Sequence, residues 1–218
     1  MVQRIIRLAR GAGTRTYVLI TAFLSLFALV GFAYYGLPFF FDFMVEDFGY
    51  SRAQVTSGNA VGKLLVAPLF GFLAGWMIDK YGPRRLMMPG AVLMGIAFIG
   101  LSRSSSLWMF YTFYVFNALG YVFGGPLPCQ VLISRWFNEN RGKAMGIAYL
   151  GIGLGGAIIP LLATNLESHF DWQKAMVILG IVIIAIAFPM PFFLKNAAGK
   201  KANVVAGAGS PPVSMKEI

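Results

Sequence analysis

One lysine and a few polar side chains interrupt apolar stretches of this sequence. Lys63 is the only charged residue inside such a stretch, and a lysine at the centre of a membrane helix costs about 2.5–3.5 kcal/mol on insertion scales. Thr56, Asn59 and Lys63 follow i, i+3, i+7 spacing and share one helical face. We interpret this face as the lining of a cavity in which Lys63 attracts an anion such as a carboxylate. The alternative is a structural lysine bonded to a carbonyl group or a lipid headgroup.

Uncharged polar residues lie in two other apolar stretches, and each offers a hydroxyl or amide group. They are Tyr34, Tyr35, Asn117, Tyr121 and Gln130. Each of them alone fits a contact between helices as well as a substrate contact. We predict a substrate-binding set of six residues: Lys63, Asn59, Tyr34, Tyr35, Asn117 and Tyr121. No Asp or Glu lies deep in an apolar stretch, so no proton relay is indicated.

Enzymatic chemistry has no support in the residue pattern. The chain has one histidine, His169, and one cysteine, Cys129, and no cluster with metal-ligand spacing. Residues 151–156 match G-x-G-x-x-G, but no strand precedes them. Residues 58–64 imitate a P-loop that is one residue short and has Leu64 at the magnesium-binding position. We therefore predict that the protein is not an enzyme, binds no metal or cofactor, and does not drive transport with ATP.

The composition indicates a membrane protein. Of 218 residues, 58% are hydrophobic and 12% charged, against about 25% charged residues in soluble domains. Such a chain cannot cover a water-exposed surface with polar groups. The net charge of +10 comes from residues between apolar stretches, which favours membrane orientation over nucleic-acid binding.

Six stretches are apolar and long enough to cross a hydrocarbon core of about 30 Å as helices. We predict spans at 17–41, 54–78, 86–103, 107–134, 144–166 and 174–194, the fourth tilted or bent near Pro126 and Pro128. The fold class is therefore an all-α integral membrane protein.

The basic residues alternate between the connections. Fourteen lysines and arginines lie in the two termini and in the second and fourth loops, and three lie in the other loops. The positive-inside rule then predicts a multi-pass protein of the cell membrane with both termini cytoplasmic. We divide the chain into a basic N-terminus (1–16), a six-span domain (17–195) and a flexible cytoplasmic tail or linker (196–218).

The loop after the second span begins with a carboxylate in an electrostatically unfavourable position. Asp79 lies at the negative end of a helix dipole, which disfavours a carboxylate by about 0.3–1 kcal/mol. Arg84, Arg85 or the N-terminus of a neighbouring helix could compensate, and Gly75 would let such a helix approach. The alternative is an ordinary polar turn with incidental charges. Elsewhere, two G-x-x-x-G pairs predict close helix packing: Gly120 with Gly124, and Gly151 with Gly155.

Three segments resemble the major facilitator superfamily. The loop after the second span resembles the cytoplasmic G-x-x-x-D-[RK]-x-G-[RP]-[RK]-[RK] loop of this family at every fixed position. The matching residues, which we predict to form a cytoplasmic gate, are Gly75, Asp79, Lys80, Gly82, Arg84 and Arg85. Residues 136–148 are similar to the W-F-x-x-x-R-G-x-A-x-G-x-A segment of the branch with monocarboxylate transporters and oxalate/formate antiporters. Residues 48–53 resemble the F-G-W-S-R-A entry to the second helix of that branch. At 171–173 the chain has Asp-Trp-Gln where the branch has Gly-Trp-Arg.

The resemblance covers residues 17–195 and implies one half, with three-plus-three helices, of a twelve-span fold. It implies a secondary transporter, or the N-terminal half of one, that moves a small organic anion such as a monocarboxylate by alternating access, and in this branch an antiporter is one possibility. The expected partners are the lipid bilayer, the substrate, and a second six-helix half or a second copy of the chain. The alternative is a truncated or non-transporting membrane protein that acts as a scaffold or partner subunit.

Overall fold

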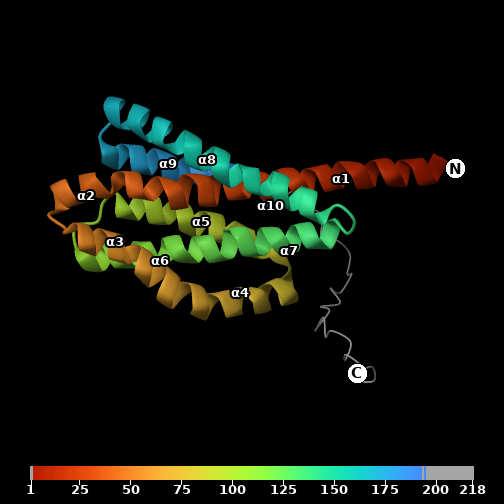
Figure 1. The fold of residues 1–218 in the computed structure, drawn as a ribbon, viewed down its shortest axis with the longest axis horizontal. Helices are drawn as coiled ribbons and strands as arrows, with labels where there is room; N and C mark the ends of the chain where they lie inside the picture. The colour runs from red at the N-terminus through yellow and green to blue at the C-terminus, as the bar shows by residue number, and fades with distance from the viewer. Residues whose placement is uncertain (1, 193, 195–218) are drawn as a thin grey trace, which may run out of the picture.

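Long helices form nearly all of the described part of the chain, which Figure 1 shows as a computed structural model. The structure describes residues 2–192 and 194, with side chains from residue 13 onwards except that of Lys63. No strand occurs in these described residues. This confirms the all-helical prediction, because a backbone in lipid must satisfy its own hydrogen bonds and a helix does so within one segment.

The first and second helical paths each contain a π-helical stretch. Helix α1 (Val2–Leu26) continues through η1 (Phe27–Tyr34) and η2 (Leu37–Phe40) into α2 (Phe41–Phe48). Helix α3 (Arg52–Val61) continues through η3 (Gly62–Val66) into α4 (Ala67–Tyr81). Both π-helical stretches lie in mid-path, where such irregularities often accompany a functional site.

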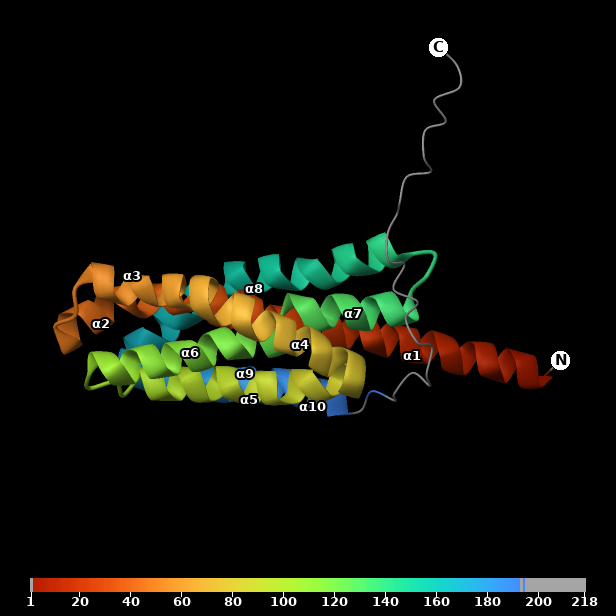
Figure 2. The same ribbon diagram turned by 90° about the horizontal axis from the view of Figure 1, so that it is seen from below.

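The remaining helices complete the bundle. They are α5 (Pro83–Leu101), α6 (Leu107–Gly124), α7 (Pro126–Trp136), α8 (Arg141–His169), α9 (Trp172–Ala187) and α10 (Pro189–Phe192). All of them run roughly along one axis (Figure 1). In Figure 2, α3 and α8 lie along the upper edge of the bundle, and α5 and α9 lie along its lower edge.

Five helical stretches of the described chain are long and apolar enough to cross a membrane: 13–48, 52–81, 83–101, 141–169 and 172–192. They correspond to the first, second, third, fifth and sixth predicted spans. The predicted fourth span, 107–134, is interrupted at Gly125 between α6 and α7. Pro126 disfavours a helical conformation in the residue before it, and Gly125 indeed has φ −84° and ψ −137°.

Loops that alternate along the sequence gather at the two ends of the bundle. At one end Tyr50 Oη donates to Ser104 O at 3.3 Å, and Trp172 Nε1 donates to Asp47 at 2.5 Å. These contacts join the first, third and fifth connections. At the other end Arg84 and Arg135 join the arginine-rich connections to helix ends. The two arginine-rich connections therefore lie at the same end of the bundle.

Glycines set the closest helix contacts. A Cβ atom at Gly155 would lie 2.7 Å from Gly31 Cα, and one at Gly151 would lie 2.5 Å from Phe23 O. On the other side of the bundle, a Cβ at Gly120 would lie 2.9 Å from Met94 N, and one at Gly124 would lie 2.5 Å from Leu29 Cδ1. All four glycines predicted to pack helices therefore lie where a side chain has no room.

Candidate functional site

A cavity of about 110 Å³ opens at the level of the two π-helical stretches. Four of the six predicted substrate-binding residues line it: Tyr34, Asn59, Asn117 and Tyr121. The rest of the lining consists of Gly62, Ala67, Tyr114, Ala118 and Val122. Hydroxyl and amide groups from three separate helical paths thus converge on one space.

Tyr114 is the polar lining residue that the sequence interpretation missed. Its hydroxyl donates to Asn59 Oδ1 at 2.8 Å, and the tyrosine is buried. This hydrogen bond joins α6 to α3 and fixes the orientation of the Asn59 amide. Spacing could have identified it, because Tyr114, Asn117 and Tyr121 follow i, i+3, i+7 on one helix.

Asn117 and Tyr34 are also held by neighbours. The Asn117 amide donates to Met94 Sδ at 3.1 Å, so this side chain is itself a contact between α6 and α5. The ring of Tyr34, the last residue of η1, lies 5.1 Å from the ring of Tyr121 between centroids. The cavity therefore presents aromatic surface together with polar atoms.

The other two predicted residues are placed differently. Tyr35 does not line the cavity; it is 56% exposed and meets the edge of the Tyr34 ring at 5.5 Å between centroids. The side chain of Lys63 lies outside the described residues. Its backbone belongs to η3 and follows Gly62, which does line the cavity.

Gln130 lies in an adjoining, more open pocket of about 270 Å³. This pocket shares Ala67, Tyr121 and Val122 with the first. The Gln130 amide donates to the hydroxyl of Tyr149, which joins α7 to α8. Polar groups therefore extend from the cavity along α7 towards the arginine-rich end of the bundle.

The predicted gate loop turns sharply between α4 and α5. Gly82 has φ +85°, a backbone conformation that side chains disfavour, so the glycine of the motif is required here. Lys80 Nζ lies 4.8 Å from the centroid of the Trp76 ring. Gly75 has nothing within 4 Å of an added Cβ, so its face of α4 is open among the described residues.

The motif arginines, two of the candidate partners of Asp79, form no ion pair with it in the described chain. The guanidinium of Arg84 donates to the carbonyl oxygens of Phe192, the last residue of α10, and of Leu194 just beyond it. Carbonyls at a helix C-terminus carry partial negative charge, and they compete successfully for Arg84.

A cation does bind at the C-terminal end of α4, and it is Arg135, to which the sequence interpretation assigned no role. Its Nη2 donates to Ile78 O at 3.3 Å, in the last turn of α4. A cation at this position stabilises the negative end of the helix dipole. The α4–α5 loop is therefore anchored by α7 on one side and connected to the end of α10 on the other.

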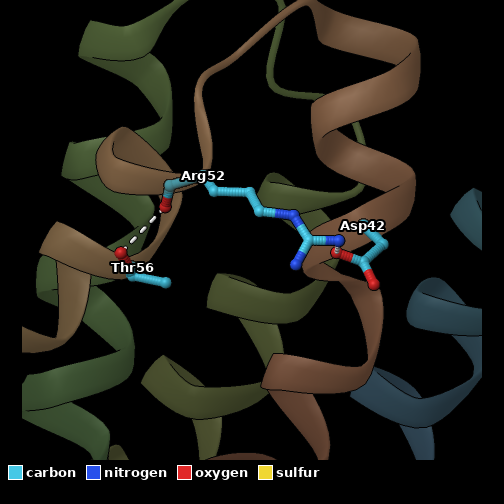
Figure 3. A network of polar contacts seen from close by, with 3 residues as sticks. All are labelled: Asp42, Arg52 and Thr56. Carbon is cyan, nitrogen blue, oxygen red and sulfur yellow. Dashed lines mark hydrogen bonds and ion pairs between the residues drawn. The ribbon is translucent and has the colours of Figure 1, made fainter.

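The opposite end of the bundle carries exposed ion pairs. Figure 3 shows Arg52 reaching from the start of α3 to Asp42 of α2, with an N–O distance of 2.9 Å. Thr56 Oγ1 donates to Arg52 O in the same turn. Both charged side chains are exposed, so the pair contributes little to stability, about 0–1 kcal/mol.

In the described residues, no group of three His, Cys, Asp or Glu side chains could hold a metal ion.

Comparison with known proteins finds one family model and relatives that are named as transport proteins or as a membrane sensor. The sequence model for the Major Facilitator Superfamily matches residues 15–217. A riboflavin transporter of Trypanosoma brucei brucei is 35% identical over 60% of this chain and 24% of its own length. A probable hexose phosphate transport protein of Chlamydia trachomatis is 30% identical over 66% of this chain and 32% of its own length. A membrane sensor protein of Salmonella typhimurium is 28% identical over 57% of this chain and 28% of its own length. The chain thus spans about a quarter to a third of these three relatives.

Proposed function

This chain belongs to the major facilitator superfamily, and on that premise we propose that it forms the first six-span half of a secondary transporter for a small organic anion. The second half lies either in the same polypeptide or in a partner chain. The observation that carries the proposal is the cavity lined by Tyr34, Asn59, Asn117 and Tyr121. Polar groups are costly inside a membrane protein, and they tend to mark substrate pathways.

The preference for an anion rests on Lys63. The described side chains that line the cavity are uncharged, and we assign the positive charge that would attract an anion to Lys63, which follows Gly62 in the sequence. A hexose phosphate, named for one relative, is an organic anion of this kind. The narrower assignment to a monocarboxylate, and exchange as the mode of transport, rest on the similarity of residues 136–148 to one branch of the family.

The cavity is small for a complete transport site. Ligand pockets usually have volumes of about 300–1,000 Å³, and this cavity has about 110 Å³. In carriers with two related halves, the substrate site lies at the interface between the halves. A second half that packs on the open faces of α4 and α8 would enlarge and close the cavity, and the loop with Gly75, Asp79 and Arg84 would then act as the cytoplasmic gate.

We further propose that α6 and α7 cross the membrane together as one broken span. Figures 1 and 2 show them end to end. The chain then has six spans and both termini on the cytoplasmic side of the cell membrane, as the distribution of arginine and lysine predicts. A membrane-impermeant reagent in intact cells would label the ends near Arg103 and Lys174 and spare Arg84.

Uptake into proteoliposomes that contain the chain with its second half tests the transport proposal. Lys63→Met should abolish uptake of the anionic substrate, and Lys63→Arg should preserve part of it because the charge remains. Lys143→Met is the matched control, since Lys143 is exposed at the start of α8 and far from the cavity lining. Unchanged uptake by Lys63→Met would remove this lysine from the substrate site.

One observation favours a second candidate, a non-transporting subunit. The relative from Salmonella typhimurium is named a membrane sensor rather than a transporter. A sensor would bind the same class of substrate in this cavity without moving it across the membrane. Saturable substrate binding by purified protein, combined with the absence of flux in the proteoliposomes, would support the sensor and exclude the transporter.

A further inference from the structure

We propose that the pocket between the ends of α5 and α9 binds the phosphate headgroup of an anionic phospholipid. This pocket has a volume of about 470 Å³ and is separate from the central cavity. It lies at the end of the bundle opposite the α4–α5 loop. Arg103, just beyond α5, and Lys174, in the first turn of α9, line it together with apolar residues.

The two cations leave the pocket positively charged. Arg103 is exposed, and its side chain forms no hydrogen bond or ion pair with another described residue. Lys174 Nζ lies 3.0 Å from Asp171 Oδ2, but both side chains are about two-thirds exposed or more. Such an exposed pair contributes little, about 0–1 kcal/mol, so Lys174 can turn to an incoming phosphate. Gln173 adds an amide donor to the lining.

An apolar surface begins directly below these cations. On α9, Ile178 and Ile181 follow Lys174 at i+4 and i+7, and both belong to the face that bears the lysine. On α5, Ile99 and Ile96 precede Arg103 with the same spacing. Ile181 is 55% exposed and Ile96 is 40% exposed. Two cations above two apolar helix surfaces match an amphiphile, whose phosphate and acyl chains lie in the same order.

The packing of the two helices explains why space remains there. They contact at Gly95 and Gly180, where an added Cβ would lie 2.8 Å or less from a backbone oxygen of the other helix. The pocket begins beyond these glycines, where Val177 and Ile178 replace them on α9. A soluble phosphate would use the cations alone, whereas a phospholipid also covers the exposed isoleucines.

The site can be tested by titrating purified protein in neutral detergent with phosphatidylglycerol and counting bound lipids by native mass spectrometry. Near a membrane surface each Lys or Arg contributes about 1 kcal/mol to the binding of anionic lipid. We therefore expect Arg103→Gln and Lys174→Gln each to weaken the first binding event about fivefold, and the double variant about thirtyfold. Binding of phosphatidylcholine should not change.

Three controls distinguish a lipid site from general electrostatic attraction, from a site for soluble phosphate and from misfolding. Arg52→Gln removes a positive charge from the same end of the bundle, and an equal loss of affinity there would reduce the effect to general electrostatics and overturn the site. Glycerol phosphate that binds as tightly as the lipid would also overturn it, because the acyl chains would then be irrelevant. Unchanged binding of phosphatidylcholine by Arg103→Gln and Lys174→Gln shows that these variants fold, and Arg103→Lys should retain most of the affinity for phosphatidylglycerol because the positive charge remains. Lipid binding is measured without transport, so failure of this inference and failure of the transport proposal are distinguishable.

Discussion

The first helical path and helix α8 have similarly apolar sequences, but they are buried to very different extents. In the most apolar window of 13–48, 61% of the residues are buried, whereas in that of α8 only 22% are buried. The corresponding shares are 50% for α5 and 18% for 52–81. Hydropathy therefore identifies segments that leave water, but it does not say whether protein or lipid replaces the water.

Glycines reveal the same division at the level of single atoms. Gly155 of α8 contacts the backbone of η1, whereas Gly153, two residues earlier on the same helix, has nothing within 4 Å of an added Cβ. Gly71 and Gly75 of α4 are open in the same way. One face of α8 is thus built for close packing within this chain. The open faces of α4 and α8 are available to lipid or to a second half.

The largest difference between the packed and the open face should appear when two glycines of α8 are each replaced by alanine. Gly155→Ala should destabilise the protein by about 1–3 kcal/mol, because its Cβ would lie 2.6 Å from Phe27 O. Gly153→Ala should leave stability unchanged or raise it by up to about 1 kcal/mol, because alanine favours the helix. Thermal unfolding in detergent measures both. Equal effects of the two substitutions would mean that the packed and open faces are not distinct.

A smaller effect is expected where the less buried α3 joins the core. Tyr114→Phe removes the hydrogen bond to Asn59 and should cost about 1 kcal/mol. Tyr81→Phe is the matched control, because the Tyr81 hydroxyl has no hydrogen bond in the described chain. In a double-mutant cycle with Asn59→Ala, the two substitutions should be coupled by most of that energy. Additive effects would show that this hydrogen bond does not hold α3.

No loss of stability is expected on the open face of α4. Gly75→Leu should leave the stability of the isolated chain unchanged or raise it by up to about 1 kcal/mol, because the added side chain meets open space and leucine favours the helix over glycine. In the presence of the second half, the same variant should reduce transport, because leucine would block close approach of a neighbouring helix. Gly13→Leu, at another open glycine, controls for the added bulk. Full transport by Gly75→Leu would exclude a close helix contact at this position.

Much of the cavity lining can be predicted from the sequence, because polar residues within apolar stretches are few. That criterion identifies Tyr34, Asn59, Asn117 and Tyr121, and the fold brings them to one cavity. The same criterion identifies Tyr35, which lies outside the cavity because adjacent residues on a helix point in different directions. Tyr114 was missed although it shares a face with Asn117. The partners of Arg84 were also missed, because no local pattern joins residue 84 to carbonyls more than a hundred residues away.

The sequence by itself determined the helical class, the positions of most apolar helical stretches and the break beside Pro126. These features are local: in lipid each segment must satisfy its own backbone hydrogen bonds, and proline restricts the backbone of the residue before it. Only the tertiary structure decided which atoms each glycine packs against, which tyrosines face the cavity and where Arg84 and Arg135 bind. Those outcomes depend on the rotation of each helix about its axis, which is fixed by contacts with its neighbours rather than by hydropathy.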